Sequence, residues 1–486
     1  MNPDTDHTLR DQRITLFIAL FAAFALMHEL LDVVHWVGHG AMGIALGCGS
    51  SLAAAALLAR PGSTPRLVVL LLIWTAHKVQ AMPAVPNHIL FTSIVNLTLL
   101  TALLVHAVSG RRGSMERSLD ELAAPPIRVG VIILYGFAVL HKLNADYFDP
   151  AVSCGPQLFR EMADHLPLLP TGTWVAWPGI IGSLVAEAAI GLMLIFRRTR
   201  ALAIAIGLLF HGLLVFHLNL YVASFTALVF SLFALFLPLP YVERITRWRP
   251  LPTSARYVPL TAAMLVIAVI AGLAWWRGAD TPEELRALMA ATVGPLMRVT
   301  VTLYAAAIVV VLGLRLIWTV KPFPAGDAVF RFGHPAFVVV PVLLLFNGFS
   351  PYLGFKTQTS FSMFSNLRTE LRNTNHFFMP VSLRLAGYQE QMVIVEEATS
   401  PVLQVYCSAK EWIPLFELRR AAAEDTSDDF RVVYRHVGNT QRIVAARAGE
   451  ADPLAAEVFD APSLLQRKLM YFRPVPPHGE ACSCRH

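Results

Sequence analysis

The sequence predicts an all-α polytopic membrane bundle of about eleven transmembrane helices, followed by a C-terminal extracytoplasmic domain that is α+β or mostly β. The composition is the first reason: 55% of the 486 residues are hydrophobic, 15% are charged, and the mean hydropathy is +0.55. A chain whose surface mainly faces water does not reach these values. The second reason is a series of apolar segments, each with the roughly 17–25 helical residues that cross a bilayer. The third is the placement of arginines between these segments.

The apolar segments follow one another with short breaks as far as residue 350. No small-residue cleavage site follows the first of them, so we expect it to remain as the first span. Residues 1–13 form the N-terminal tail, 14–240 and 241–350 are expected to be transmembrane, and 351–486 form the C-terminal domain. The predicted spans are 14–36, 41–59, 66–84, 88–108, 127–147, 172–196, 200–217, 222–240, 257–276, 302–320 and 334–350.

Arginine and lysine collect in alternate gaps between the spans, for example at Arg111, Arg112 and Arg117. The other gaps, such as 80–87 and 218–224, are nearly without positive charge. Because cytoplasmic loops collect positive charge, the N-terminus is predicted to be cytoplasmic and the C-terminal domain extracytoplasmic. The formal charge of +6 therefore reflects membrane orientation and not a nucleic-acid partner. The arginine- and alanine-rich composition is typical of a GC-rich bacterial genome, which predicts the bacterial inner membrane.

The composition becomes mixed after residue 350, where the outer domain is expected to begin. Segments 392–396, 402–407 and 430–434 are rich in β-branched and aromatic residues, which predicts short strands. The cysteines share no metal-ligand spacing, so we expect no metal, whereas a disulfide and the redox state of the terminal C-x-C pair stay open. The five cysteines are Cys48, Cys154, Cys407, Cys482 and Cys484.

Several polar side chains fall at the ends of predicted spans, where burial is costly and usually marks a site. With the predicted orientation, these residues gather at the extracytoplasmic side: Lys78, Asn87, His88, His141, Lys142, Asp146 and His217. Only six of the 39 Lys and Arg residues are lysines, and a desolvated lysine, unlike an arginine, can lose its proton and act as a base. Lys142 is therefore a candidate for chemistry. The alternative for Lys142, and the preferred one for Lys78, is snorkelling, in which the ammonium reaches the lipid headgroups.

The first span carries His28, Asp32, His35 and His39 at spacings that place them on one helical face. They fit metal or haem ligands or, as we prefer, a polar seam hydrogen-bonded to neighbouring helices, because one helix rarely supplies a full coordination shell. Glu187, in the sixth span, is expected to have a buried partner such as a histidine or serine, and its role could be purely structural.

Residues 135–148 read YGFAVLHKLNADYF. This segment resembles the signature helix of the vitamin K-dependent gamma-carboxylases and the wider horizontally transferred transmembrane (HTTM) family. Lys142 falls where that family has its catalytic base, whereas Tyr147 replaces its tryptophan and His141 a second lysine. The resemblance implies that 14–240 is a transmembrane catalytic core.

Two further segments resemble the same family, in the same order along the chain. Asn87-His88 is similar to its Asn-His pair and Phe216-His217 to its Phe-His segment, while Glu187 falls where the family has an acidic residue. The implied catalytic residues are Lys142, His88 and His217, and the supporting polar residues are Asn87, His141, Asp146, Glu187 and Lys78.

The resemblance implies a gamma-glutamyl carboxylase-like enzyme, with lyase and epoxidase chemistry. A neutral lysine would deprotonate a reduced vitamin K or menaquinone-type quinol so that it reacts with O2. The strong base formed would remove a γ-proton from a glutamate or related substrate, and the carbanion would capture CO2. The implied partners are the lipid bilayer, the lipid-soluble quinol and a peptide or protein substrate on the extracytoplasmic side.

The competing hypothesis is a non-enzymatic polytopic membrane protein, either a transporter or an assembly or immunity factor with a structural polar seam. The predicted spans lack the paired, glycine- or proline-broken helices of many transporters, which counts against transport. Replacement of Lys142 by arginine discriminates the two, because a snorkelling cation tolerates the change and a proton acceptor does not.

Overall fold

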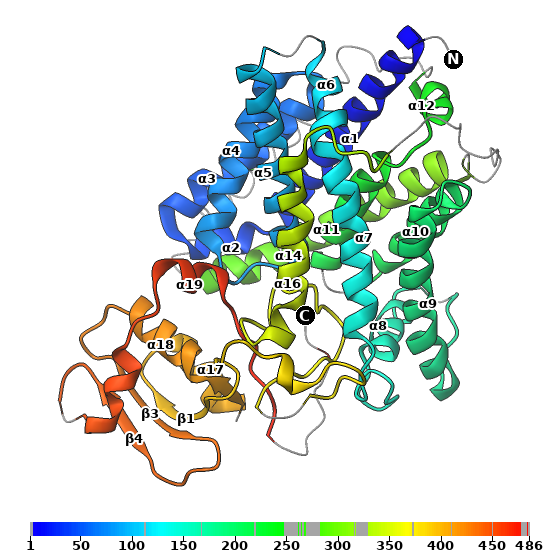
Figure 1. The fold of residues 1–486 in the computed structure, drawn as a ribbon. Helices are drawn as coiled ribbons and strands as arrows, with labels where there is room; N and C mark the ends of the chain where they lie inside the picture. The colour runs from blue at the N-terminus through cyan, green and yellow to red at the C-terminus, as the bar shows by residue number, and fades with distance from the viewer. Residues whose placement is uncertain are drawn as a thin grey trace.

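A computed structural model describes residues 3–477 and Cys484, except 111–112, 167, 218–219, 247–260, 262–263, 265–266, 269–281, 315, 317–328, 372–373, 410 and 450. In this part of the chain, a bundle of helices is joined to a smaller domain with an antiparallel sheet (Figure 1). The bundle helices are α1 (Pro3–Leu31), α2 (Val33–Gly38), α3 (Gly40–Ala59), α4 (Thr64–Ala81), α5 (Asn87–Val108), α6 (Met115–Ser118), α7 (Ala124–His141), α8 (Cys154–Ala163), α9 (Ala176–Ile195), α10 (Arg200–Leu214), α11 (Leu220–Ala234), α12 (Leu239–Thr246), α14 (Pro282–Ile308) and α16 (Val339–Leu353).

Seven helices among the described residues are long and apolar enough to cross a membrane, or eight if one bent pair counts as a span. The seven are His7–Leu31, Gly40–Ala59, Asn87–Val108, Met115–His141, Thr173–Ile195, Pro295–Gly313 and Pro335–Leu353. Each corresponds to one predicted span, so the membrane bundle is confirmed. The prediction of about eleven spans is not.

Four predicted spans account for the difference. The segment predicted as 66–84 forms α4, which is not among the seven, and that predicted as 200–217 forms α10, which has only 15 residues. The segment predicted as 222–240 is broken between α11 and α12, and most of 257–276 lies outside the described residues. In the segments predicted as 200–217 and 222–240, apolar composition extends past the end of a helix, and for this reason hydropathy overestimates the length of these two spans.

The break between α11 and α12 bends the chain by 113°, so the expectation of unbroken spans was wrong here. Two buried arginines satisfy the carbonyls that the break exposes. Arg13 Nη1 donates to Leu237 O at 3.3 Å, and Arg128 Nε donates to Leu235 O at 2.9 Å. Both guanidinium groups also contact Asp120 Oδ1, at 2.9 and 3.2 Å. Non-helical backbone is tolerated in a membrane protein only where protein groups satisfy it in this way.

Close helix packing in the bundle is illustrated by α7 and α16. A Cβ atom built on Gly348 of α16 would lie 2.2 Å from the Phe137 ring of α7. The aromatic ring therefore occupies the space that the missing side chain leaves. Helix α7 also packs against α9, so both α16 and α9 are its neighbours.

The C-terminal domain is α+β, with a four-stranded antiparallel sheet in the order β2-β1-β3-β4. Its strands are β1 (Met392–Ala398), β2 (Trp412–Pro414), β3 (Arg431–His436) and β4 (Ile443–Ala446), and its helices are α17 (Pro401–Ala409), α18 (Leu415–Glu424) and α19 (Leu464–Leu469). The predicted strand at 402–407 was wrong, because this segment forms α17. Its apolar residues pack with one buried side, around Leu403, against the sheet.

The C-terminal domain is fixed to one end of the bundle. Lys468 Nζ donates to Gln80 O at 2.9 Å and to Met82 O at 3.0 Å, which caps the end of α4. A disulfide joins Cys154, at the start of α8, to Cys484. The domain therefore lies at the end of the bundle where α5 begins and α7 ends.

Candidate functional site

Two adjoining cavities lie between this end of the bundle and the segment that follows α16. The first, here called the histidine cavity, has a volume of about 320 Å³ and is lined by His88. The second, the lysine cavity, has a volume of about 240 Å³ and is lined by Lys142. Four residues line both cavities and form their common wall: Val222, Phe225, Met363 and Phe364. His88 and Lys142 are therefore brought to neighbouring cavities from separate helices.

Lys142 is buried, with 4% of its surface exposed, and its Nζ is in direct contact with Glu187 Oε2 of α9. The snorkelling alternative is thus wrong for this lysine. Glu187 has a buried partner, as expected, but the partner is Lys142 and not a histidine or serine. The Tyr147 ring lies 5.8 Å from Lys142 Nζ. The ammonium and the carboxylate form an ion pair at the cavity wall.

The turn after α7 holds Lys142 in place. Asn144 Nδ2 donates to His141 O at 2.7 Å and to Ser365 O at 2.6 Å, while its Oδ1 accepts from Tyr147 N at 2.9 Å. One buried amide side chain therefore joins the helix end, the following loop and the segment after α16. This locks the backbone from which the lysine projects.

His141 and Asp146 were predicted as supporting residues, and both lie outside the two cavities. His141 Nε2 is 3.1 Å from Gly348 O of α16, on a different side of α7 from Glu187. Asp146 Oδ2 accepts from Asn375 Nδ2 at 3.0 Å. Both residues therefore stabilise the structure beside the cavities and do not line them.

Sequence reasoning missed a histidine in the lysine cavity. His211 of α10 is buried there, and its Nε2 lies 2.7 Å from the Tyr135 hydroxyl of α7. The predicted His217 does not appear among the described residues that line either cavity, and its Nε2 pairs with Glu161 of α8 at 2.6 Å. The chain contains two Phe-His pairs six residues apart, at 210–211 and 216–217. The pair at 210–211 was the sequence feature from which His211 could have been predicted.

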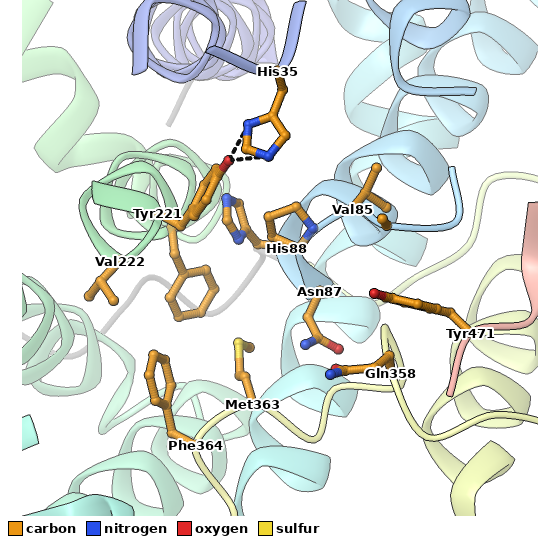
Figure 2. Close-up of a pocket in the computed structure, with 13 residues that line it drawn as sticks. His35, Val85, Asn87, His88, Tyr221, Val222, Gln358, Met363, Phe364 and Tyr471 are labelled. Carbon is orange, nitrogen blue, oxygen red and sulfur yellow. Dashed lines mark hydrogen bonds between the residues drawn. The ribbon is translucent and has the colours of Figure 1, made fainter. Parts of the chain in front are cut away.

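The histidine cavity is built around the start of α5 (Figure 2). Asn87 Oδ1 accepts from Phe361 N at 2.6 Å, and His88 Nε2 lies 3.1 Å from Ser224 Oγ of α11. Tyr471 enters the cavity from the C-terminal domain, and burial raises the pKa of its phenol. It stays a neutral hydroxyl that can donate a hydrogen bond.

The segment after α16 has an unusual backbone. Five non-glycine residues within it adopt positive φ: Thr359, Phe361, Phe364, Asn366 and Leu371, between 52° and 64°. Such conformations cost of order 1–3 kcal/mol each and persist where the surroundings impose them, often at functional sites. Lys356, in the same segment, donates to Thr359 Oγ1 at 3.1 Å, and burial lowers its pKa to about 7.

The prediction of one helical face was wrong, because α1 ends at Leu31, Asp32 follows it and His35 lies on α2. His28 and Asp32 nevertheless take part in the preferred polar seam. His28 Nδ1 lies 2.9 Å from Ser224 Oγ, and Lys78 Nζ of α4 contacts Asp32 and Glu29 at 3.1 Å each. Lys78 is 1% exposed, so snorkelling is wrong for it too. Glu29, which sequence reasoning missed, is fully buried. His39 is exposed, and its Nδ1 lies 2.7 Å from His35 O.

The arrangement places an amine in a predominantly apolar cavity, beside a second cavity lined by amide, imidazole and phenol groups. In the described part of the chain, no group of three or more His, Cys, Asp or Glu side chains is placed to hold a metal ion. Comparison of the chain with protein-family models, with curated proteins and with solved structures gives no match.

Proposed function

We propose that this chain is an integral membrane enzyme that binds a lipid-soluble quinol in the lysine cavity and uses Lys142 as the base. A single observation carries the proposal: the Lys142 amine is buried at an apolar cavity and paired with a carboxylate. The other buried cations of the bundle have structural partners, because Arg13 and Arg128 donate to carbonyls of the α11–α12 break and Lys78 pairs with two carboxylates. Lys142 lines a largely apolar cavity that a ligand can fill.

The cavity residues fit a quinol. Apolar side chains from α7, α8, α9 and α10 form most of the lining, with Lys142, Glu187, Tyr135 and His211 as the main polar groups. A largely apolar cavity with a few fixed polar groups is typical of small-molecule sites. Helix α9 is peripheral, because Val185 and Leu192 are exposed, and this suits access from the lipid.

Lys142 and Glu187 form a pair that can supply a neutral amine. When the proton moves from Lys142 to Glu187, the ion pair becomes a neutral pair and no uncompensated charge is left in the apolar cavity. The amine can then accept a proton from an acidic hydroxyl of a ligand. The Tyr135–His211 pair, at 2.7 Å, offers a second polar group for orienting that ligand.

A bound quinol, once deprotonated and oxidised by O2, would supply the strong base needed to carboxylate a glutamate or related substrate with CO2. The histidine cavity suits the polar substrate. Asn87, Gln358 and Tyr471 present amide and hydroxyl groups there, and two of the three come from segments that follow the bundle (Figure 2). A peptide or protein bound by the C-terminal domain would reach this side.

The test is epoxide formation from reduced vitamin K, and from a menaquinol, by the purified protein in lipid nanodiscs with O2. Lys142→Ala and Lys142→Arg are expected to lower the rate by at least about 10²-fold, the usual contribution of a general base. Arg431→Ala, which removes an exposed cation of the C-terminal domain, serves as the control. Unchanged epoxidation in Lys142→Ala, with normal insertion, would exclude the proposal.

The second candidate is a non-enzymatic membrane protein, a transporter or an assembly or immunity factor. The observation that favours it is the α11–α12 break, because discontinuous helices line the substrate sites of many transporters. Full retention of cellular function in Lys142→Arg, together with absence of epoxide in the parent protein, would select this class.

A further inference from the structure

A further cavity, here called the arginine cavity, lies at the end of the bundle opposite the C-terminal domain, near the starts of α1 and α7 (Figure 1). Its volume is about 390 Å³. Among the described residues that line it are four arginines and two acidic residues: Arg10, Arg13, Arg128, Arg331, Asp120 and Glu121. The lining is therefore basic, whereas that of the lysine cavity is largely apolar.

One carboxylate at this cavity contacts three guanidinium groups. Asp120 Oδ1 lies 2.9 Å from Arg13 Nη2 and 3.2 Å from Arg128 Nη2. Asp120 Oδ2 lies 3.5 Å from Arg10 Nη1. Three cations around one anion favour a further anion beside them, and guanidinium groups bind phosphate oxygens with particular strength.

The remaining lining charges do not reverse this balance. Glu121 Oε1 lies 3.1 Å from Arg117 Nε, so this carboxylate has a cation of its own. Arg331 is exposed, and in the part of the chain that the structure describes it forms no ion pair. Arg331 can therefore bind an incoming anion without breaking an existing ion pair.

The position of the arginines relative to the predicted spans indicates which anion reaches them. Three of them lie within three residues of the start of a predicted span: Arg13, Arg128 and Arg331. In the predicted orientation these starts are on the cytoplasmic side, at the level of the lipid headgroups. Basic pockets between transmembrane helices on that side bind the headgroups of anionic lipids.

An apolar groove between α5 and α16, here called the α5–α16 groove, begins beside the arginine cavity. Residues 331–333 line the cavity, and His334, which follows directly, lines the groove. The groove has a volume of about 270 Å³, and its α5 wall extends over 94–105, which is about 16 Å of helix. Leu97 and Leu343, on its two walls, are 53% and 51% exposed, so the groove is open at the outer surface of the bundle.

We propose that an anionic phospholipid binds at this end of the bundle, with its phosphate in the arginine cavity and one acyl chain in the α5–α16 groove. Charge complementarity favours a lipid with a net negative headgroup, because a zwitterionic headgroup would add a cation beside the arginines. The adjoining groove favours a lipid over a soluble phosphate compound. This site shares no lining residue with the histidine and lysine cavities, so the proposal does not depend on the quinol reaction.

The test is native mass spectrometry of the purified chain, released from micelles that contain phosphatidylglycerol and phosphatidylcholine of equal chain length. We expect the chain to retain phosphatidylglycerol in preference to phosphatidylcholine. Arg331→Ala should lower the retention of phosphatidylglycerol about fivefold, the usual effect of one basic residue beside anionic lipid. The matched control is Arg198→Ala, which removes an exposed cation outside the cavity on the same predicted side and should leave retention unchanged.

A second variant tests the groove. Thr101 is exposed in the groove wall, and its hydroxyl donates to Leu97 O of the same helix at 2.7 Å. In Thr101→Trp the indole should fill the groove, and retention of phosphatidylglycerol should be lost. Glycerol phosphate, which carries the anion without acyl chains, should leave the bound lipid in place.

Four results would overturn the proposal. Equal retention of the two lipids, or unchanged retention of phosphatidylglycerol in Arg331→Ala, would exclude a role for the arginine cavity. Unchanged retention in Thr101→Trp would exclude the groove as the site of the chain. Displacement of the lipid by glycerol phosphate would assign the cavity to a soluble phosphate compound instead.

Discussion

Removal of the Lys78 ammonium tests most sharply whether the polar seam is buried. Lys78 Nζ lies 3.1 Å from both Glu29 Oε1 and Asp32 Oδ2, and it is 1% exposed. In Lys78→Met the unbranched stem is kept while two buried carboxylates lose their shared cation. Breaking a buried pair by removing one partner costs about 3–5 kcal/mol. The unfolding free energy of Lys78→Met should fall by this amount.

The assay is reversible unfolding in mixed micelles, followed by circular dichroism over a denaturing-detergent titration. Glu29→Gln in the Lys78→Met background should restore part of the loss, with a coupling above about 1 kcal/mol, because the residues are in contact. Arg431→Met, at an exposed pair with Glu397, should leave the unfolding free energy unchanged. A Lys78→Met loss as small as that of Arg431→Met would show that the Lys78 ammonium reaches the headgroups, and the reasoning would be refuted.

Three further outcomes are expected. Gly348→Ala should lower the unfolding free energy by about 1–3 kcal/mol, because the new Cβ overpacks against Phe137. Gly136→Ala should not lower it, because the new Cβ would meet no neighbouring atom within 4 Å. Thermal unfolding checks both variants. Non-reducing peptide mapping should recover one disulfide-linked pair, Cys154 with Cys484, and separate Cys154 and Cys484 peptides would contradict it. Burial lowers the pKa of Lys356 from 10.5 to about 7, so between these values the unfolded chain binds more protons and the unfolding free energy should rise with pH. Lys356→Met should remove that rise, and an equal slope in both proteins would place Lys356 in solvent.

The spans that could be predicted from the sequence are those in which apolar length and unbroken backbone coincide. The segment that forms Asn87–Val108 is an example, because its predicted limits, 88–108, differ by one residue. The segment predicted as 222–240 failed because hydropathy does not register a bend whose carbonyls are satisfied by Arg13 and Arg128, both distant in sequence. The strand predicted at 402–407 was wrong because strand propensity depends on context, and here the packing of Leu403 against the sheet is made by a helix.

The candidate site was predictable one residue at a time, but not as contacts. Lys142 and His88 were found because titratable groups are rare in apolar segments. The Lys142–Glu187 pair was not, since nothing in a single sequence shows that α7 and α9 are adjacent. His211 was missed for the same reason: its role depends on facing Tyr135 across two helices. His217 was predicted from the Phe-His pair at 216–217, whereas the histidine that lines the lysine cavity belongs to the pair at 210–211.

Photoaffinity labelling with an azido-naphthoquinone, followed by peptide mass spectrometry, tests most directly whether the lysine cavity binds the quinol. Adducts should form on lining residues such as Ala138, Phe210 and Leu214, and excess reduced vitamin K should suppress them. Adducts confined to lipid-facing residues such as Val185 and Leu192, and unaffected by competition, would contradict a quinol site at Lys142.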